Sequence, residues 1–113
     1  MVRKHKINKY KYEFRASDPE NVGVLYLIEN KDTVCMAIFT EDDEELPPPR
    51  EGLNGIIYIA YPFNWLNNVI DMLRFEKPVY FTWDDSTLMA RITTEEEPVG
   101  EEEHRSLFKF LFG

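Results

Sequence analysis

Polar and apolar residues alternate near the beginning of the chain. Tyr10, Tyr12 and Phe14 take every second position, and charged residues stand at 9, 11, 13 and 15. A period of two predicts a β-strand with one aromatic face and one charged face. Because the charged side chains then lie on the opposite face, we expect the three rings to enter the core.

Two apolar stretches follow at residues 22–28 and 33–40, and both are rich in β-branched and aromatic residues. Residues 29–32 between them have the composition of a hairpin turn. Both stretches are apolar on both faces, which favours strands in the centre of a sheet that is covered on each side.

Three more strands are predicted at residues 56–60, 79–83 and 87–93, with a turn at 84–86. Residues 41–55 are expected to form a long loop. Pro47, Pro48 and Pro49 within it favour an extended polyproline conformation and cannot donate hydrogen bonds to a sheet.

Residues 63–75 have the periodicity of an amphipathic helix. At 100° per residue, the apolar side chains gather on one half of the helical wheel, and Phe75 alone falls outside it. Pro62 suits the first turn, and the Lys77-Pro78 pair ends the helix. The apolar set comprises Phe63, Trp65, Leu66, Val69, Ile70, Met72 and Leu73.

These elements predict a single α+β domain over residues 1–113. It would contain a mostly antiparallel sheet of about six strands with the helix 63–75 packed on one face. Its parts are a basic N-terminal strand (1–15), an acidic proline loop (41–55), an acidic loop (94–103) and an apolar C-terminal segment (104–113), which forms a short helix or a strand.

The charge of the chain is divided unevenly. The formal net charge of the 113 residues is −8, yet residues 1–15 hold six Lys and Arg against Glu13 alone. The net negative charge of the whole chain disfavours a polyanionic partner, whereas the basic N-terminal segment by itself does not. This basic segment can also pair with the acidic part of its own chain or of a neighbouring subunit.

Common catalytic and cofactor motifs are missing from the sequence. It has no nucleophile elbow, phosphate-binding glycine loop, dinucleotide fingerprint or zinc-protease motif. Cys35 is the single cysteine, and its apolar strand indicates a small buried residue rather than a reactive thiol. We therefore expect no enzyme activity, no cofactor and no metal ion.

A cytoplasmic protein that does not enter membranes is expected. A single cysteine permits no intramolecular disulfide, which favours a reducing compartment. The basic N-terminus is not followed by the apolar region of a signal peptide, and the longest apolar runs fall far short of the about 20 residues of a membrane span.

The leading functional hypothesis is a small acidic interaction or regulatory domain that self-associates, most simply as a dimer. An apolar C-terminal segment must pack on its own domain or on a second subunit. The candidate partner-binding residues are Leu107, Phe108, Phe110, Leu111 and Phe112, and the loop 41–50 is a second candidate surface for a protein partner.

The alternative is single-stranded nucleic-acid binding through the basic and aromatic N-terminal strand. Cations follow phosphates and rings stack on bases in such sites. The candidate residues are Lys4, Lys6, Lys9, Lys11 and Arg15. The element order over residues 7–93 is similar to the single-strand-binding Whirly-type architecture, without a family motif that matches residue by residue. A third hypothesis is a small enzyme with a carboxylate-based pocket.

Overall fold

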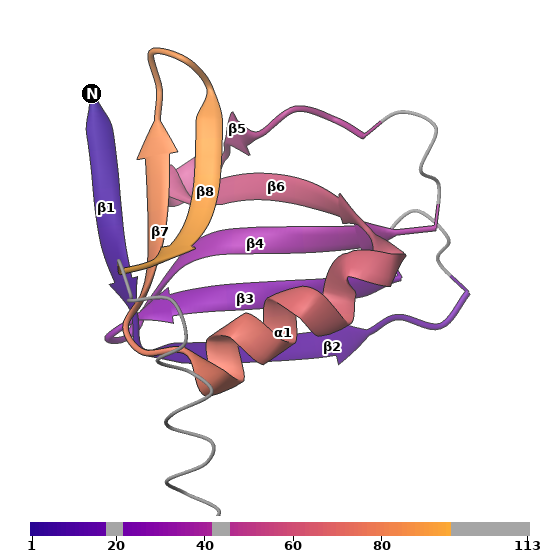
Figure 1. Ribbon diagram of the computed structural model, residues 1–113. Helices are drawn as coiled ribbons and strands as arrows, with labels where there is room; N and C mark the ends of the chain where they lie inside the picture. The colour runs from indigo at the N-terminus through magenta and orange to yellow at the C-terminus, as the bar shows by residue number, and fades with distance from the viewer. Residues whose placement is uncertain (18–21, 42–45, 96–113) are drawn as a thin grey trace, which may run out of the picture.

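The computed structural model describes residues 1–17, 22–41 and 46–95, which form two β-sheets and one α-helix (Figure 1). The predicted α+β class is confirmed. The described residues form eight strands instead of about six, and these strands divide between two sheets instead of forming one. The C-terminal segment 104–113, predicted as a short helix or strand, lies outside the described residues, as does most of the predicted loop 94–103.

The N-terminal segment forms two strands, which corrects the prediction of one basic strand. β1 (Val2–Ile7) and β2 (Lys9–Phe14) belong to different sheets. Asn8 separates them: its backbone N–H donates to the carbonyl of Ile28, and its side chain exchanges hydrogen bonds of 2.9 and 3.2 Å with Asn30. These contacts turn the backbone at a position that the alternating pattern does not mark.

The larger sheet has five strands in the order β2-β3-β4-β6-β5. β3 (Gly23–Glu29) and β4 (Asp32–Thr40) form the predicted hairpin, and both lie in the interior of the sheet. β4 runs parallel to β6 (Ile57–Pro62), while the other strand pairs of the described residues are antiparallel. The sheet is therefore mostly antiparallel, as predicted.

The predicted loop 41–55 contains two short elements. β5 (Arg50–Glu51) pairs with the beginning of β6, and a 3₁₀ turn, η1 (Leu53–Gly55), connects the two strands. The N–H of Gly52 donates a 2.8 Å hydrogen bond to the carbonyl of Ile56, which closes this narrow connection. A strand of two residues is too short to produce a periodic signal in the sequence.

The smaller sheet has three strands in the order β1-β7-β8. β7 (Val79–Asp84) and β8 (Met89–Thr94) form an antiparallel hairpin, and β1 pairs antiparallel with the free side of β7. The strand predicted at 87–93 begins two residues later, because Leu88 has a positive φ of 56° and belongs to the turn.

The predicted helix 63–75 is confirmed, with a first turn of 3₁₀ type. This turn, η2 (Phe63–Trp65), continues directly into α1 (Leu66–Phe75). Leu66 and Val69 of α1 are buried in the core. In Figure 1 the helix crosses the five-stranded sheet.

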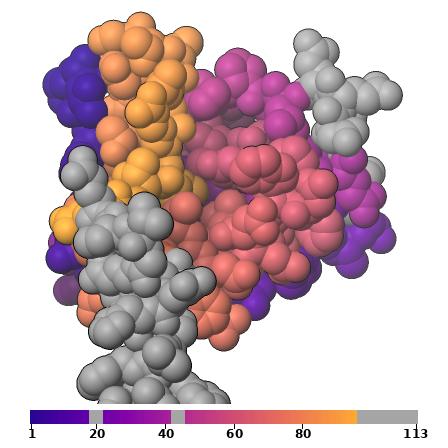
Figure 2. Space-filling view, in the orientation of Figure 1, coloured from indigo at the N-terminus to yellow at the C-terminus, as the bar shows by residue number. Residues whose placement is uncertain are grey.

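The core lies between the five-stranded sheet, the helix and the three-stranded sheet. Alternate residues of β3, β4 and β6 share one face and join one buried cluster with α1 and β7. Figure 2 shows this side of the molecule, occupied largely by the helix and the β7–β8 hairpin. The cluster comprises Leu25, Leu27, Cys35, Ala37, Phe39, Ile57, Ile59, Leu66, Val69, Phe81 and Trp83.

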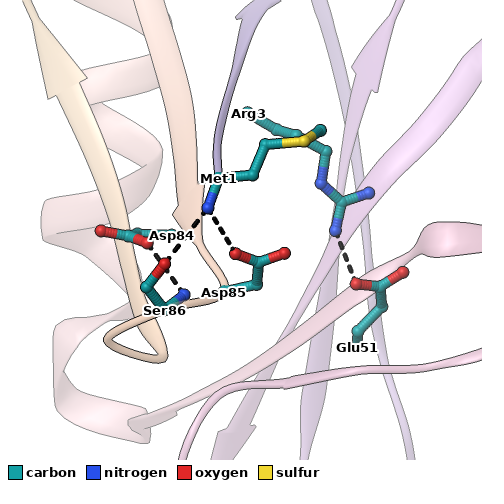
Figure 3. Close-up of polar contacts among 6 residues, drawn as sticks. All are labelled: Met1, Arg3, Glu51, Asp84, Asp85 and Ser86. Atoms are coloured by element: carbon teal, nitrogen blue, oxygen red, sulfur yellow. Dashed lines mark hydrogen bonds and ion pairs between the residues drawn. The ribbon is translucent and has the colours of Figure 1, made fainter.

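Ion pairs and hydrogen bonds hold β1 in position (Figure 3). The amino group of Met1 lies 2.7 Å from the carboxylate of Asp85 in the β7–β8 turn. Arg3 forms a 2.7 Å ion pair with Glu51, which connects β1 of the smaller sheet to β5 of the larger one. Part of the basic segment thus pairs with acidic groups of its own chain, one of the two arrangements predicted.

Candidate functional site

The second face of the five-stranded sheet points away from the helix and the smaller sheet. Within residues 1–17, 22–41 and 46–95, both of these elements pack on the opposite face, where the core cluster lies. On β3, β4 and β6, the residues that alternate with the core residues are half-buried, except for Val24 and Thr40, which are buried. We call this the uncovered face; as far as the described residues go, it corrects the prediction that β3 and β4 are covered on both sides.

Five residues form a straight row across the uncovered face. Lys11 on β2 lies opposite Tyr26 on β3, and Tyr26 lies opposite Met36 on β4. Met36 in turn is paired with Tyr58 on β6, and Tyr58 with Arg50 on β5. Residues paired in this way share a face and lie within side-chain contact of each other. We call these five residues the tyrosine row.

A cation lies at each end of the tyrosine row. The Lys11 ammonium is 5.5 Å from the centroid of the Tyr26 ring, and the Arg50 guanidinium is 5.0 Å from that of Tyr58. Such cation–π contacts contribute about 0.5–1 kcal/mol at exposed sites. The row therefore combines two aromatic rings with two positive charges on one open surface.

The Tyr26 ring is fixed at its hydroxyl end by Glu13 and Arg15. The hydroxyl donates a 2.9 Å hydrogen bond to Oε1 of Glu13, and the same oxygen accepts hydrogen bonds of 3.0 and 3.2 Å from the Arg15 guanidinium. The Arg15 hydrogen bonds, and after them the Tyr26 one, hold the pKa of Glu13 below its ordinary value. Partial burial, and then the Glu13 hydrogen bond, raises the pKa of Tyr26.

Gly52 supports the Tyr58 ring at the other end of the row. A Cβ at position 52 would overlap the ring of Tyr58, so a side chain larger than hydrogen does not fit beside it. The backbone of the β5–β6 connection thus lies directly against this ring. Arg3 stabilises the same connection through its ion pair with Glu51, the neighbour of Arg50 (Figure 3).

Apolar residues border the tyrosine row. Val24, Ile38 and Ala60 are paired with one another on β3, β4 and β6, next to the row on the same face. Ile28 borders the row on its other side, where it is paired with the cationic Lys9. The uncovered face is therefore apolar and aromatic in its centre, with charged groups along its edges.

The charge of the described residues differs from that of the whole chain. Residues 1–17, 22–41 and 46–95 contain eleven Lys and Arg and ten Asp and Glu. The acidic excess of the chain is carried by residues 18–21, 42–45 and 96–113. Positive and negative charges are therefore nearly balanced among the described residues.

The five cations proposed for nucleic-acid binding do not form one stripe. Lys4 and Lys6 are on the outer face of the three-stranded sheet, where Lys4 lies 4.2 Å from the centroid of the Tyr80 ring. Lys9 and Lys11 are on the uncovered face of β2, and Arg15 is paired with Glu13. The structure thus brings Lys11 to the tyrosine row and separates it from the cations of β1.

The three N-terminal rings depart from their predicted place in the core. Tyr10 packs against the core cluster, but Tyr12 and Phe14 are 46% and 62% exposed. The alternation predicted their face correctly, since Tyr12 lies opposite Leu25, a core residue. It did not predict that Tyr12 and Phe14 stay largely exposed on this face, so the prediction of burial is wrong for these two rings.

Tyr12 and Phe14 belong to an exposed cluster of rings with Phe63 and Trp65. The ring centroids of Tyr12 and Phe14 are 5.6 Å apart, and those of Phe14 and Phe63 are 6.4 Å apart. Trp65, half exposed, stacks on Tyr61 at 6.4 Å. We call Tyr12, Phe14, Phe63 and Trp65 the aromatic cluster; it lies where β2 ends beside the first turn of the helix.

The sequence analysis missed Tyr26, Met36, Tyr58 and Arg50. A signal was present: each tyrosine alternates with aliphatic residues, as in Leu25-Tyr26-Leu27 and Ile57-Tyr58-Ile59. A tyrosine between two core residues indicates a strand with a second face that reaches solvent, because the hydroxyl needs a hydrogen-bond partner.

Other predicted sites have the following positions. Cys35 is fully buried in the core, and burial raises the pKa of its thiol. No group of three His, Cys, Asp or Glu side chains suited to a metal ion occurs in the part of the chain that the structure describes. The partner-binding candidates Leu107, Phe108, Phe110, Leu111 and Phe112 lie outside that part.

No helix among the described residues is long and apolar enough to cross a membrane. Comparison with protein-family models, with curated proteins and with solved structures gives no match. A function for this chain therefore rests on the chemistry of its own surfaces.

Proposed function

We propose that this protein is a non-enzymatic binding module that holds single-stranded nucleic acid on its uncovered face. The observation that carries the proposal is the tyrosine row, in which Tyr26 and Tyr58 stand on one surface between Lys11 and Arg50. Single strands are bound by rings that stack on bases and by cations that meet phosphates.

The geometry of a sheet suits this ligand. Tyr26 and Tyr58 are separated by one strand, β4, which places their backbones about 10 Å apart. Met36 fills the space between them with a flexible apolar side chain. Two bases can lie on the two rings while the sugar–phosphate backbone passes the cations at the edges, Lys9 among them.

The test is an anisotropy titration with a labelled oligothymidylate of about 12 nucleotides at low salt, where electrostatic attraction is least screened. The replacements Tyr26→Leu and Tyr58→Leu retain apolar volume but remove the rings. Because stacking contributes about 1–3 kcal/mol per base, we expect each replacement to weaken binding by roughly fivefold or more. Lys11→Gln and Arg50→Gln should each lower the salt dependence of binding by about one unit of slope.

Matched controls are available on other surfaces. Tyr80→Leu removes a ring from the three-stranded sheet, and Lys31→Gln removes a cation from the turn of the β3–β4 hairpin. Neither should change the affinity. The proposal is wrong if the oligonucleotide does not bind at low salt, or if the double variant Tyr26→Leu/Tyr58→Leu binds as tightly as the wild type.

Self-association is a second candidate function, favoured by the aromatic cluster. Phe14 and Trp65 expose more than half of their surface, although burying a ring from water is favourable. A second copy of the chain can cover this cluster, and the C-terminal residues 107–112 remain proposed contacts as well. The wild-type mass in solution should be that of a dimer, and Phe14→Ser/Trp65→Ser or deletion of residues 106–113 should give the monomer. A monomeric wild type would remove this candidate.

A further inference from the structure

A cavity of about 500 Å³ lies where the corner between β1 and β2 meets the C-terminal end of α1. Its walls come from residues 6–10 and from residues 73–79, the last of which begins β7. Its volume is within the range of about 300–1,000 Å³ that small-molecule sites occupy. Apart from Lys9, its lining residues do not belong to the uncovered face.

Four cationic residues line this cavity: Lys6, Lys9, Arg74 and Lys77. Glu76 is the one acidic residue among the lining residues, and it has an interaction of its own. The ion pairs found among residues 1–17, 22–41 and 46–95 do not include any of these four cations. Positive charges gathered in a concave site repel each other and attract an anion from solution.

The cavity also offers an aromatic surface. Phe75, the last residue of α1, is 66% exposed, although its large apolar ring gains nothing from contact with water. The Arg74 guanidinium lies 5.2 Å from the centroid of this ring. Tyr10 and Leu73, which pack against the core, form an apolar part of the wall.

We propose that this cavity binds a nucleotide, with its phosphates between Lys6, Lys9 and Lys77 and its base on the ring of Phe75. A nucleotide combines the two properties that the lining offers, multiple negative charge and a flat aromatic ring. Arg74 lies beside both parts and can contact either. This proposal is independent of strand binding on the uncovered face, because all of its side chains except Lys9 are different and its ligand is a mononucleotide.

The experiment is a calorimetric titration of the full chain with ADP at low ionic strength, repeated with adenosine and with inorganic pyrophosphate. We expect saturable binding of ADP, and binding of adenosine and of pyrophosphate at least about tenfold weaker, because each lacks one of the two contacts. The double variant Arg74→Gln/Lys77→Gln should weaken ADP binding by at least about tenfold. Phe75→Leu should remove the preference for ADP over pyrophosphate.

The control Lys31→Gln/Arg91→Gln changes the net charge by the same amount as Arg74→Gln/Lys77→Gln but alters exposed cations outside the cavity. Its ADP affinity should therefore stay within about twofold of the wild type. Tyr26→Leu/Tyr58→Leu should also bind ADP normally, which separates this site from the tyrosine row. Three results would overturn the proposal: no saturable ADP binding, equal affinity for ADP and pyrophosphate, or an unchanged ADP affinity in Arg74→Gln/Lys77→Gln. The last would mean that these cations serve only to offset the dipole of the helix end.

Discussion

The hydroxyl of Tyr26 and the carboxylate of Glu13 are joined by a 2.9 Å hydrogen bond across neighbouring strands. Lys11, two residues before Glu13, lies over the ring of the same tyrosine. Residues of β2 therefore contact both the ring face and the hydroxyl of Tyr26. A ring held in this way loses little conformational freedom when a planar ligand stacks on it, which is the advantage of a preorganised site.

The first prediction concerns the pKa of Glu13. The Arg15 hydrogen bonds are the largest cause of its depression, followed by the hydrogen bond from Tyr26. Arg15→Gln should therefore raise the pKa of Glu13 toward its ordinary value of 4.5, and Tyr26→Phe should raise it by less. Carbon-detected NMR titration of the side-chain carboxyl measures both, with Lys31→Gln as the unaffected control. An unchanged Glu13 pKa in Arg15→Gln would contradict the contact.

The second prediction concerns acid denaturation. The His5 hydrogen bond, with a smaller contribution from the Lys6 N–H, holds the pKa of Glu29 below its ordinary value of 4.5. A lowered pKa in the folded state adds stability above the ordinary value, and this stability is lost as the pH falls through the lowered one. Glu29→Gln should be less stable than the wild type at neutral pH but should lose less stability between about pH 6 and 3.

Thermal unfolding across this pH range measures the difference between Glu29→Gln and the wild type. Asp32→Asn is a matched control on the neighbouring strand, since Asp32 lies opposite Glu29 and is exposed. The two variants should differ in the slope of Tm against pH. Parallel curves for Glu29→Gln and the wild type would show that the His5–Glu29 contact does not contribute to stability.

The third prediction concerns Trp83, which is fully buried in β7. Its indole Nε1 has no hydrogen-bond partner among the described residues. Trp83→Ala should destabilise the fold by about 3–5 kcal/mol, because it leaves a large cavity. Trp83→Phe should cost less than about 2 kcal/mol, because losing the unpaired donor offsets part of the lost packing. Urea denaturation measures both changes in the free energy of unfolding. If Trp83→Phe lost as much stability as Trp83→Ala, the indole N–H would have to be hydrogen-bonded in solution.

The fourth prediction concerns Gly52. An added methyl group would overlap the ring of Tyr58, so Gly52→Ala should displace that ring and weaken oligonucleotide binding by roughly fivefold or more. Gly23→Ala is the control, because a Cβ there meets its nearest atom at an ordinary 3.6 Å. NMR shifts of the Tyr58 ring report the displacement directly. Normal binding despite a displaced ring would remove Tyr58 from the proposed site.

Strong local patterns were sufficient to predict most of the elements. The helix 63–75 and the hairpin of β3 and β4 each have a sequence signal that spans the whole element. The division into two sheets was not predictable in this way, because it depends on the hydrogen bonds of Asn8 with Ile28 and Asn30. Those partners lie far from Asn8 in the sequence, and no pattern near Asn8 predicts the contacts.

The candidate site was less accessible to prediction than the fold. Of its five residues, Lys11 alone was singled out from the sequence. The tyrosine row depends on the register of four strand pairs, one of them parallel, and register is a property of the assembled sheet. Phe14 illustrates the same limit, since alternation gives its face but not whether a neighbour covers it.

The pairing of β1 with β7 has a consequence for the order in which the chain folds. Val2 lies opposite Asp84, so β1 cannot pair with β7 until almost all of the described chain has left the ribosome. The five-stranded sheet can assemble earlier, from residues 9–62. Pairings between such distant segments also slow folding. In pulsed hydrogen exchange, the amides of β1 should therefore become protected last. The N-terminal strand should be the last strand to join the folded structure, although it comes first in the sequence.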